Sequence, residues 1–259
     1  MRTALATRYV TPFREGGSMP GLVEADDQGL YVAKFRGAGQ GARAIVAEWI
    51  AGELARAAGL RVPELIRLEV EAALGRNEPD YEIRQLLKAS AGINLGIDFL
   101  PGSITFDPAV GPAPAAALAS EVVWFDAFVQ NVDRTARNTN LLLWHRQLWL
   151  IDHGAALYFH HAWDRAGDAA GSPFAAVKDH VLLPWAAELG EAGARLAPRL
   201  GAAVVAGILA ALPDAWLAGE PGFATPDDHR AAYAAHLARR LEAAPIFVEE
   251  ALRARASLV

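Results

Sequence analysis

The chain changes its structural character at Pro101-Gly102. Before this dipeptide, short runs rich in Thr, Val, Tyr and Phe alternate with glycine- and Asp-containing turns, a pattern typical of strands. A helix is predicted over residues 42–58, where apolar residues recur at helical spacing before Gly59. After the dipeptide, Ala-rich segments favour helices. The predicted strands cover residues 3–13, 22–25, 30–35, 61–71 and 81–87.

This order predicts an α+β chain with two lobes. Residues 1–98 form a small β-rich N-lobe with one main helix, residues 99–104 a hinge, and residues 105–259 a larger, mostly helical C-lobe. Ligands favour clefts between such lobes. The C-lobe helices are predicted over 115–130, 174–190, 193–212 and 226–256, with Pro184 and Pro198 interrupting the second and third.

The composition limits the partners and the chemistry that we expect. A hydrophobic fraction of 53% and seven Trp residues suffice for a large core. The absence of cysteine excludes disulfides, thiolate catalysis and Cys-ligated zinc, and it fits a reducing compartment. The net charge of -6 argues against direct nucleic-acid binding. The longest apolar stretch, residues 200–212, is short of the ~20 residues that cross a bilayer, and no secretory signal is visible, so we expect a cytoplasmic protein without membrane contact.

Three polar residues stand around an apolar hairpin in the C-lobe. Asp133 precedes Asn138 by five positions, and Asp152 follows strands predicted at 140–144 and 148–151, which a polar turn at 145–147 joins. Because the two strands run up and back, we expect Asp152 to return close to Asp133 and Asn138. One carboxylate for an acceptor hydroxyl, with an amide and a carboxylate for Mg²⁺, suits phosphoryl transfer from ATP. The same residues also form ordinary turns, so the loop by itself leaves both interpretations open.

The N-lobe offers a matching set of candidates. Lys34 shares a strand face with Val32, which would let the amine reach phosphates while the valine lies under an adenine. Glu48 on the following helix is the predicted partner of Lys34, and Glu53 is a rival. The backbone of the glycine turn at residues 16–21 could cover phosphates. Each residue taken alone is equally compatible with an exposed strand, a solvated helix face or a plain hairpin loop.

The order of these motifs along the chain resembles that of the HipA-like kinases, a branch of the protein-kinase-like superfamily. The resemblance is carried by Gly17-Ser-Met-Pro, Tyr31-Val-Ala-Lys-Phe, Ala47-Glu48, Gly59-Leu-Arg-Val-Pro63, Asp133-Arg-Thr-Ala-Arg-Asn138 and Ile151-Asp-His-Gly154. It implies a bilobal kinase fold, ATP, Mg²⁺ and phosphorylation of a Ser or Thr hydroxyl on a protein.

The resemblance also implies a role for each candidate. Asp133 would orient the acceptor hydroxyl and take its proton, Asn138 and Asp152 would hold Mg²⁺, and Lys34, oriented by Glu48, would contact the phosphates. The nucleotide-binding residues would be Gly16, Gly17, Ser18, Val32, Lys34, Phe99 and Leu100. HipA toxins carry a phosphorylatable serine in their phosphate loop, so Ser18 is a candidate for autophosphorylation.

Other interpretations remain open. Val132 and His153 replace residues of the usual kinase motifs, which leaves room for a nucleotide-binding pseudokinase that regulates a partner. A small-molecule acceptor, as in antibiotic kinases of related fold, is a further alternative. Arg134 and Arg137 could hold a phosphate or an acidic substrate, or pair with surface carboxylates. A zinc site built from His153, His160, His161 and Asp164 is disfavoured because their spacing fits no common ligand set.

Overall fold

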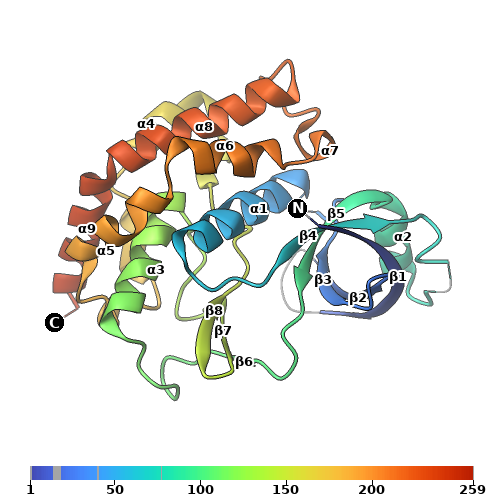
Figure 1. Ribbon diagram of the computed structural model, residues 1–259, viewed down its shortest axis with the longest axis horizontal. Helices are drawn as coiled ribbons and strands as arrows, with labels where there is room; N and C mark the ends of the chain where they lie inside the picture. Colours follow the sequence, from blue (N-terminus) through green and yellow to red (C-terminus); the bar gives the residue numbers. More distant parts are fainter. Residues whose placement is uncertain (1, 14–18, 40, 77, 259) are drawn as a thin grey trace.

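The protein is described by a computed structural model that covers residues 2–13, 19–39, 41–76 and 78–258 (Figure 1). The N-terminal strands close into a barrel, and the helices of the C-terminal half pack to one side of it. This mixture confirms the predicted α+β class. Residues 14–18, which include Gly16, Gly17 and Ser18, lie outside the described residues.

The barrel contains five strands in the order β1-β2-β3-β5-β4. Neighbouring strands are antiparallel, except that β1 runs parallel to β4 and thereby closes the ring. Small or apolar side chains fill its interior, among them Ala4, Val23, Ala33, Ile66 and Leu68. The strands are β1 (Thr3–Pro12), β2 (Gly21–Ala25), β3 (Leu30–Lys34), β4 (Leu65–Val70) and β5 (Gly92–Asp98).

The strand predicted over residues 81–87 is wrong, because this segment is helix α2 (Tyr81–Ala89). The Asp80 carboxylate accepts the backbone N–H groups of Glu82 and Ile83, which caps the first turn. Ile83, Leu86 and Leu87 recur at helical spacing and are buried in the barrel core. These residues were expected to add a strand to the sheet, and they instead form a helix that packs against the barrel core.

Strand β5 was not predicted, and its barrel-facing positions carry no large apolar side chain. Gly96 faces Ile66, and a Cβ atom built on Gly96 would lie 2.8 Å from Ile66 Cγ1. The Asn94 amide is buried and donates to the carbonyls of Ser90 and Gly92. On the other face of the strand, Ile93, Leu95 and Ile97 alternate and pack into the larger core. The glycines and the asparagine between them are also typical of loops, and the segment was not recognised as a strand.

Helix α1 (Gly41–Ala58) packs against the outside of the barrel and also against α6 and α7. Its buried residues belong to the same hydrophobic cluster as those of the C-terminal helices, so the larger core includes part of the N-terminal sequence. Trp49 Nε1 donates to the carbonyl of Ile208 at 3.2 Å, and its ring lies 6.5 Å from that of Trp216.

A second, three-stranded sheet lies between the barrel and the helices (Figure 1). It consists of β6 (Ile104–Thr105), β7 (Leu141–Trp144) and β8 (Gln147–Leu150). The predicted hairpin is confirmed as β7 and β8, but its turn is one residue shorter than predicted. Only His145 and Arg146 form the turn, both at positive φ, and Gln147 already belongs to β8 and pairs with Trp144. This two-residue turn matches the twist of the flanking strands.

The C-terminal half is helical, but its elements are shorter than predicted. Segment 174–190 forms two 3₁₀ turns (Ala175–Asp179 and Leu183–Trp185), segment 193–212 breaks near Pro198, and segment 226–256 breaks before Pro245. The helices are α3 (Ala116–Val129), α4 (Ala166–Ala170), α5 (Leu189–Leu196), α6 (Ala202–Ala210), α7 (Asp214–Leu217), α8 (Pro226–Glu242) and α9 (Ala244–Ala256). Further 3₁₀ turns cover Tyr158–His161, Trp163–Arg165 and Ala197–Arg199.

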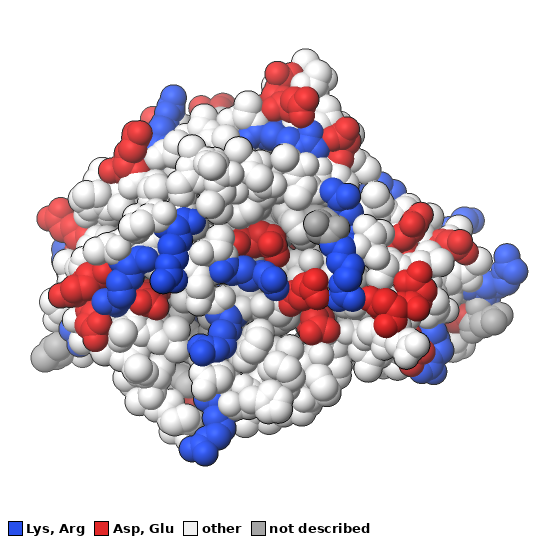
Figure 2. All heavy atoms as spheres, in the orientation of Figure 1, with Lys and Arg blue, Asp and Glu red and all other residues white. Residues whose placement is uncertain are grey.

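Within the described ranges, no single helix is both long enough and apolar enough to cross a bilayer. One pair among the described helices, Leu189–Arg199 with Ala202–Ala210, is long and apolar enough when taken together, but it is bent by 63°. Lys and Arg side chains mingle with Asp and Glu side chains on the face shown in Figure 2, with broad uncharged areas between them.

Candidate active site

Lys34 joins the barrel to the helical part of the molecule. Along β3, the side chains of Tyr31 and Ala33 enter the barrel core, whereas Val32 and Lys34 point outward. Lys34 is only 7% exposed, and its Nζ lies 2.6 Å from Glu48 Oε2 and 2.5 Å from Asp152 Oδ1. One amine therefore bridges a strand, a helix and the end of a hairpin.

Glu48, and not Glu53, is the partner of Lys34, which confirms the preferred of the two predicted pairs. Glu53 points away and lies 3.4 Å from Arg56 on its own helix. Burial alone would lower the pKa of Lys34, but the carboxylates of Glu48 and Asp152 outweigh it and raise that pKa. Burial alone would raise the pKa of Glu48, but Lys34 and hydrogen bonds from His153 lower it. The pair is therefore ionised at neutral pH.

His153 holds the far oxygen of Glu48. Its backbone N–H donates to Glu48 Oε1 at 3.0 Å, and its ring Nδ1 lies 3.4 Å from the same oxygen. The ring is fully buried. Sequence reasoning treated His153 as a departure from the kinase motif and as a member of a disfavoured zinc site, and no local pattern indicated that it would meet the helix bearing Glu48.

The loop after α3 brings Asp133 and Asn138 into contact. Asn138 Nδ2 donates to Asp133 Oδ2 at 2.7 Å, and the backbone N–H of Thr135 donates to the carbonyl of Asn138 at 2.9 Å. Asn140, which was not a candidate, donates from Nδ2 to the backbone carbonyl of Asp133 at 3.2 Å. Its φ of 49° lies in the left-handed region that Asn tolerates well, a conformation that the structure shows and the sequence does not.

The two arginines of this loop have different surroundings. Arg134 is buried and pairs with Asp126, a buried carboxylate on α3, at 2.5 Å. This contact excludes both roles considered for Arg134, since it reaches neither the cavity nor a surface carboxylate. Arg137 is exposed and lines the large cavity described next, where it remains a candidate phosphate or substrate contact.

A cavity of about 1390 Å³ lies between the barrel, the strand-to-helix connection and the hairpin. This volume exceeds the ~300–1,000 Å³ of ordinary small-molecule sites. Asp133 and Glu48 are not among its lining residues, and each instead contacts a residue that is. The predicted residues on its wall are Val32, Lys34, Phe99, Leu100, Asn138 and Asp152.

Asn138 and Asp152 fit a hard divalent cation. Asn138 uses its amide nitrogen to bond Asp133, which leaves the amide oxygen as the group that can face the cavity. Asp152 bonds Lys34 through Oδ1, while its side chain is 46% exposed, so Oδ2 is the available oxygen. An amide oxygen and a carboxylate oxygen are ligands that Mg²⁺ accepts. No group of three or more His, Cys, Asp or Glu residues with metal-binding geometry occurs among the described residues.

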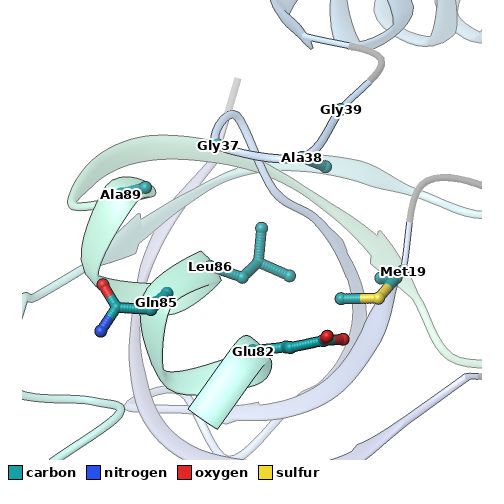
Figure 3. Close-up of a pocket in the computed structure, with 8 residues that line it drawn as sticks. All are labelled: Met19, Gly37, Ala38, Gly39, Glu82, Gln85, Leu86 and Ala89. Carbon is teal, nitrogen blue, oxygen red and sulfur yellow. The ribbon is translucent and has the colours of Figure 1, made fainter.

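A smaller cavity of about 350 Å³ lies at one end of the barrel (Figure 3). Met19 and Leu86 extend toward its centre, and the loop of Gly37, Ala38 and Gly39 forms its rim. It shares no lining residue with the large cavity, so Lys34, Asn138 and Asp152 lie on the wall of the large cavity and not on that of the smaller one.

Comparisons with known proteins agree with this geometry. A search of curated protein sequences gives no match. Among solved structures, the fold is similar to that of a Helicobacter pylori proinflammatory kinase, CtkA, with 13% identity, a TM-score of 0.55, and coverage of 92% of this chain and 94% of that chain. At this identity the likeness shows the fold. The family model described as HipA-like kinase matches residues 7–244. The chain therefore belongs to the HipA-like kinase family.

Proposed function

We propose that this protein transfers the γ-phosphoryl group of ATP, with Mg²⁺, to a hydroxyl group of a protein. The observation that carries the proposal is the contact of the buried Lys34 amine with both Glu48 and Asp152 on the wall of the large cavity. Three charged groups from distant parts of the chain meet at this point. Burying charges is costly, so their convergence at a cavity wall favours a functional site.

The nucleotide would enter between the barrel and the helical part of the molecule. In this proposal the barrel is the N-lobe, the helical part is the C-lobe, and residues 99–104 are the hinge. Val32, Phe99 and Leu100 supply apolar surface for an adenine ring. Lys34 lies two residues beyond Val32 on the same strand face, which directs its amine toward the phosphates. Glu48 and His153 keep that amine charged and oriented.

Asn138 and Asp152 would hold Mg²⁺, through the two oxygens described above. Bound there, the ion neutralises charge on the phosphate oxygens. Asp152 would then serve two partners, because its Oδ1 also contacts Lys34.

Asp133 would accept the proton of the acceptor hydroxyl. Its carboxylate is oriented by the Asn138 amide and its backbone carbonyl by Asn140, so the group is held before any substrate arrives. The size of the cavity leaves room for an acceptor side chain beside a nucleotide. The proposed acceptor is a protein in the cytoplasm, and the experiment below distinguishes it from a small-molecule acceptor.

The test combines ATP turnover with nucleotide binding. Asp133→Asn should lower turnover by at least about 100-fold, the usual contribution of a general base, while the thermal shift produced by ATP and Mg²⁺ persists. Asp152→Asn should reduce the Mg²⁺-dependent part of that shift. Asp164→Asn is the control, since Asp164 is an exposed carboxylate whose recorded ion pair is with Arg165 at 3.9 Å.

Each outcome separates the alternatives. Full turnover in Asp133→Asn would refute the assignment of the base. A thermal shift without turnover in the unmodified protein would favour the pseudokinase. Labelled phosphate recovered on a small molecule from a cell lysate, and not on protein, would show that the acceptor is a small molecule and not a protein.

A further inference from the structure

Arg134 is a charged side chain with no access to solvent, directly after the proposed base. It is 1% exposed and is among the largest fully buried side chains of the described chain. A buried guanidinium is costly unless every contact it makes compensates the lost hydration. Its contacts therefore indicate why the fold retains it.

The guanidinium of Arg134 ties together both ends of the β7–β8 hairpin. Its Nη1 donates to the carbonyl of Asn140, just before β7, and to the carbonyl of Ile151 at 3.2 Å, just after β8. Asn140 follows Asn138 by two residues, and Ile151 directly precedes Asp152. A single nitrogen, Nη1, thus contacts the backbone beside each of the two proposed Mg²⁺ ligands, while Nη2 has no hydrogen-bond partner among the described residues.

Asp126 and His180 hold the guanidinium of Arg134 in place through a chain of hydrogen bonds. Arg134 Nε lies 2.5 Å from Asp126 Oδ2, and the same oxygen lies 3.0 Å from His180 Nε2. His180 Nδ1 accepts the backbone N–H of Leu182 at 3.0 Å, so the ring proton sits on Nε2 and is donated to Asp126. Burial would raise the pKa of Asp126, but Arg134 and His180 lower it, so the carboxylate stays charged.

We propose that Arg134, oriented by Asp126 and His180, is a positioning residue that sets the separation of Asn138 and Asp152 and thereby the affinity for Mg²⁺. This inference rests on the proposed function, because it concerns the same metal site. Arg134 itself touches neither the cavity nor the metal ligands' side chains. It acts through the backbone.

Arginine suits this role because its rigid plane carries two separate donors, Nε for Asp126 and Nη1 for the two carbonyls. A lysine has one nitrogen, which would have to serve Asp126 and both carbonyls from a single point. The core contains a matched control in Arg240 on α8, which is also fully buried. Arg240 donates to the carbonyls of Ala127, Ala170 and Ser172, none of which adjoins Asn138 or Asp152.

The experiment compares Arg134→Lys with Arg240→Lys in the full chain. Each variant is titrated with Mg²⁺ at saturating ATP while the thermal midpoint is recorded, and the half-saturating Mg²⁺ concentration is the readout. Arg134→Lys should raise that concentration at least about tenfold, the usual effect of losing a residue that orients metal ligands. Arg240→Lys should lower the thermal midpoint and leave the half-saturating concentration unchanged. Phosphoryl transfer, where a substrate is known, should follow the same titration.

His180→Asn keeps the inference testable if Arg134→Lys does not fold. Asparagine retains an acceptor for the Leu182 N–H and removes the donor to Asp126. It should raise the half-saturating Mg²⁺ concentration in the same direction and by less.

The outcomes are distinct from those of the proposed function. No Mg²⁺-dependent shift in the unmodified protein would refute the metal site itself. A normal shift there, with Arg134→Lys matching Arg240→Lys, would overturn the positioning role alone, as would an unchanged titration in His180→Asn.

Discussion

Replacing Glu48 by Gln keeps the shape of the side chain and removes one of the two charges that surround Lys34. Glu48 is 1% exposed and Lys34 is 7% exposed, so the amine cannot regain its hydration in the folded state. Removing one partner of a buried ion pair costs about 3–5 kcal/mol. Lys34 keeps its contact with Asp152, whose side chain is 46% exposed, and we therefore expect a loss near the lower limit, about 3 kcal/mol.

The double variant Lys34→Met/Glu48→Gln tests the reasoning more sharply. Because it removes both charges together, it leaves no buried ion without a partner, and it should be at least about 2 kcal/mol more stable than the sum of the single effects predicts. Urea unfolding, followed by circular dichroism, of the unmodified protein, Lys34→Met, Glu48→Gln and the double variant gives this coupling energy.

Glu53→Gln is the control on the same helix. Its contact with Arg56 is a partly exposed pair one turn away, so its removal should change the free energy of unfolding by less than about 0.5 kcal/mol. A coupling energy below about 0.5 kcal/mol for Lys34 and Glu48, or equal losses in Glu48→Gln and Glu53→Gln, would refute the argument from burial.

Two further predictions concern the stability of the fold. Burial lowers the pKa of His160 to about 3 and that of His236 to about 4. Below about pH 6.5 the two rings therefore bind protons in the unfolded chain but remain neutral in the folded protein. The free energy of unfolding should fall by about 2 kcal/mol between about pH 6.5 and 5.5, and thermal unfolding of His236→Gln should show a shallower decline. Gly96→Ala should cost about 1–3 kcal/mol because its Cβ would meet Ile66 at 2.8 Å. Gly154→Ala, whose nearest contact is 3.5 Å, should cost much less, and equal midpoints in urea would contradict this contrast.

Local pattern predicted the elements in which one periodicity dominates. Strand β3, helix α1, helix α3 and the β7–β8 hairpin were all anticipated, because their apolar residues recur at strand or helix spacing. Helix α2 was mistaken for a strand, since a nine-residue segment carries too few periods to separate the two patterns. Strand β5 was missed although Ile93, Leu95 and Ile97 alternate along it, because the Asn and Gly residues between them are also typical of loops.

The candidate site shows the same division. The side-chain direction of Lys34 follows from the alternation of β3, and the contact of Asp133 with Asn138 follows from a five-residue loop. The choice of Glu48 over Glu53 depends on how α1 is rotated against the barrel. That rotation is set by packing on helices about 150 residues later in the chain, as in the bond from Trp49 to Ile208.

The sequence by itself determined the order of β3, α1, α3 and the β7–β8 hairpin, the spacing of Asp133 and Asn138, and the strand face that Lys34 shares with Val32. These are properties of neighbouring residues, and backbone geometry converts them directly into direction and distance. Tertiary structure alone decided that Arg134 is buried between two carbonyls and that His153 reaches Glu48. Such contacts join elements that are distant in the chain, and only the packing of the whole core selects which side chains meet.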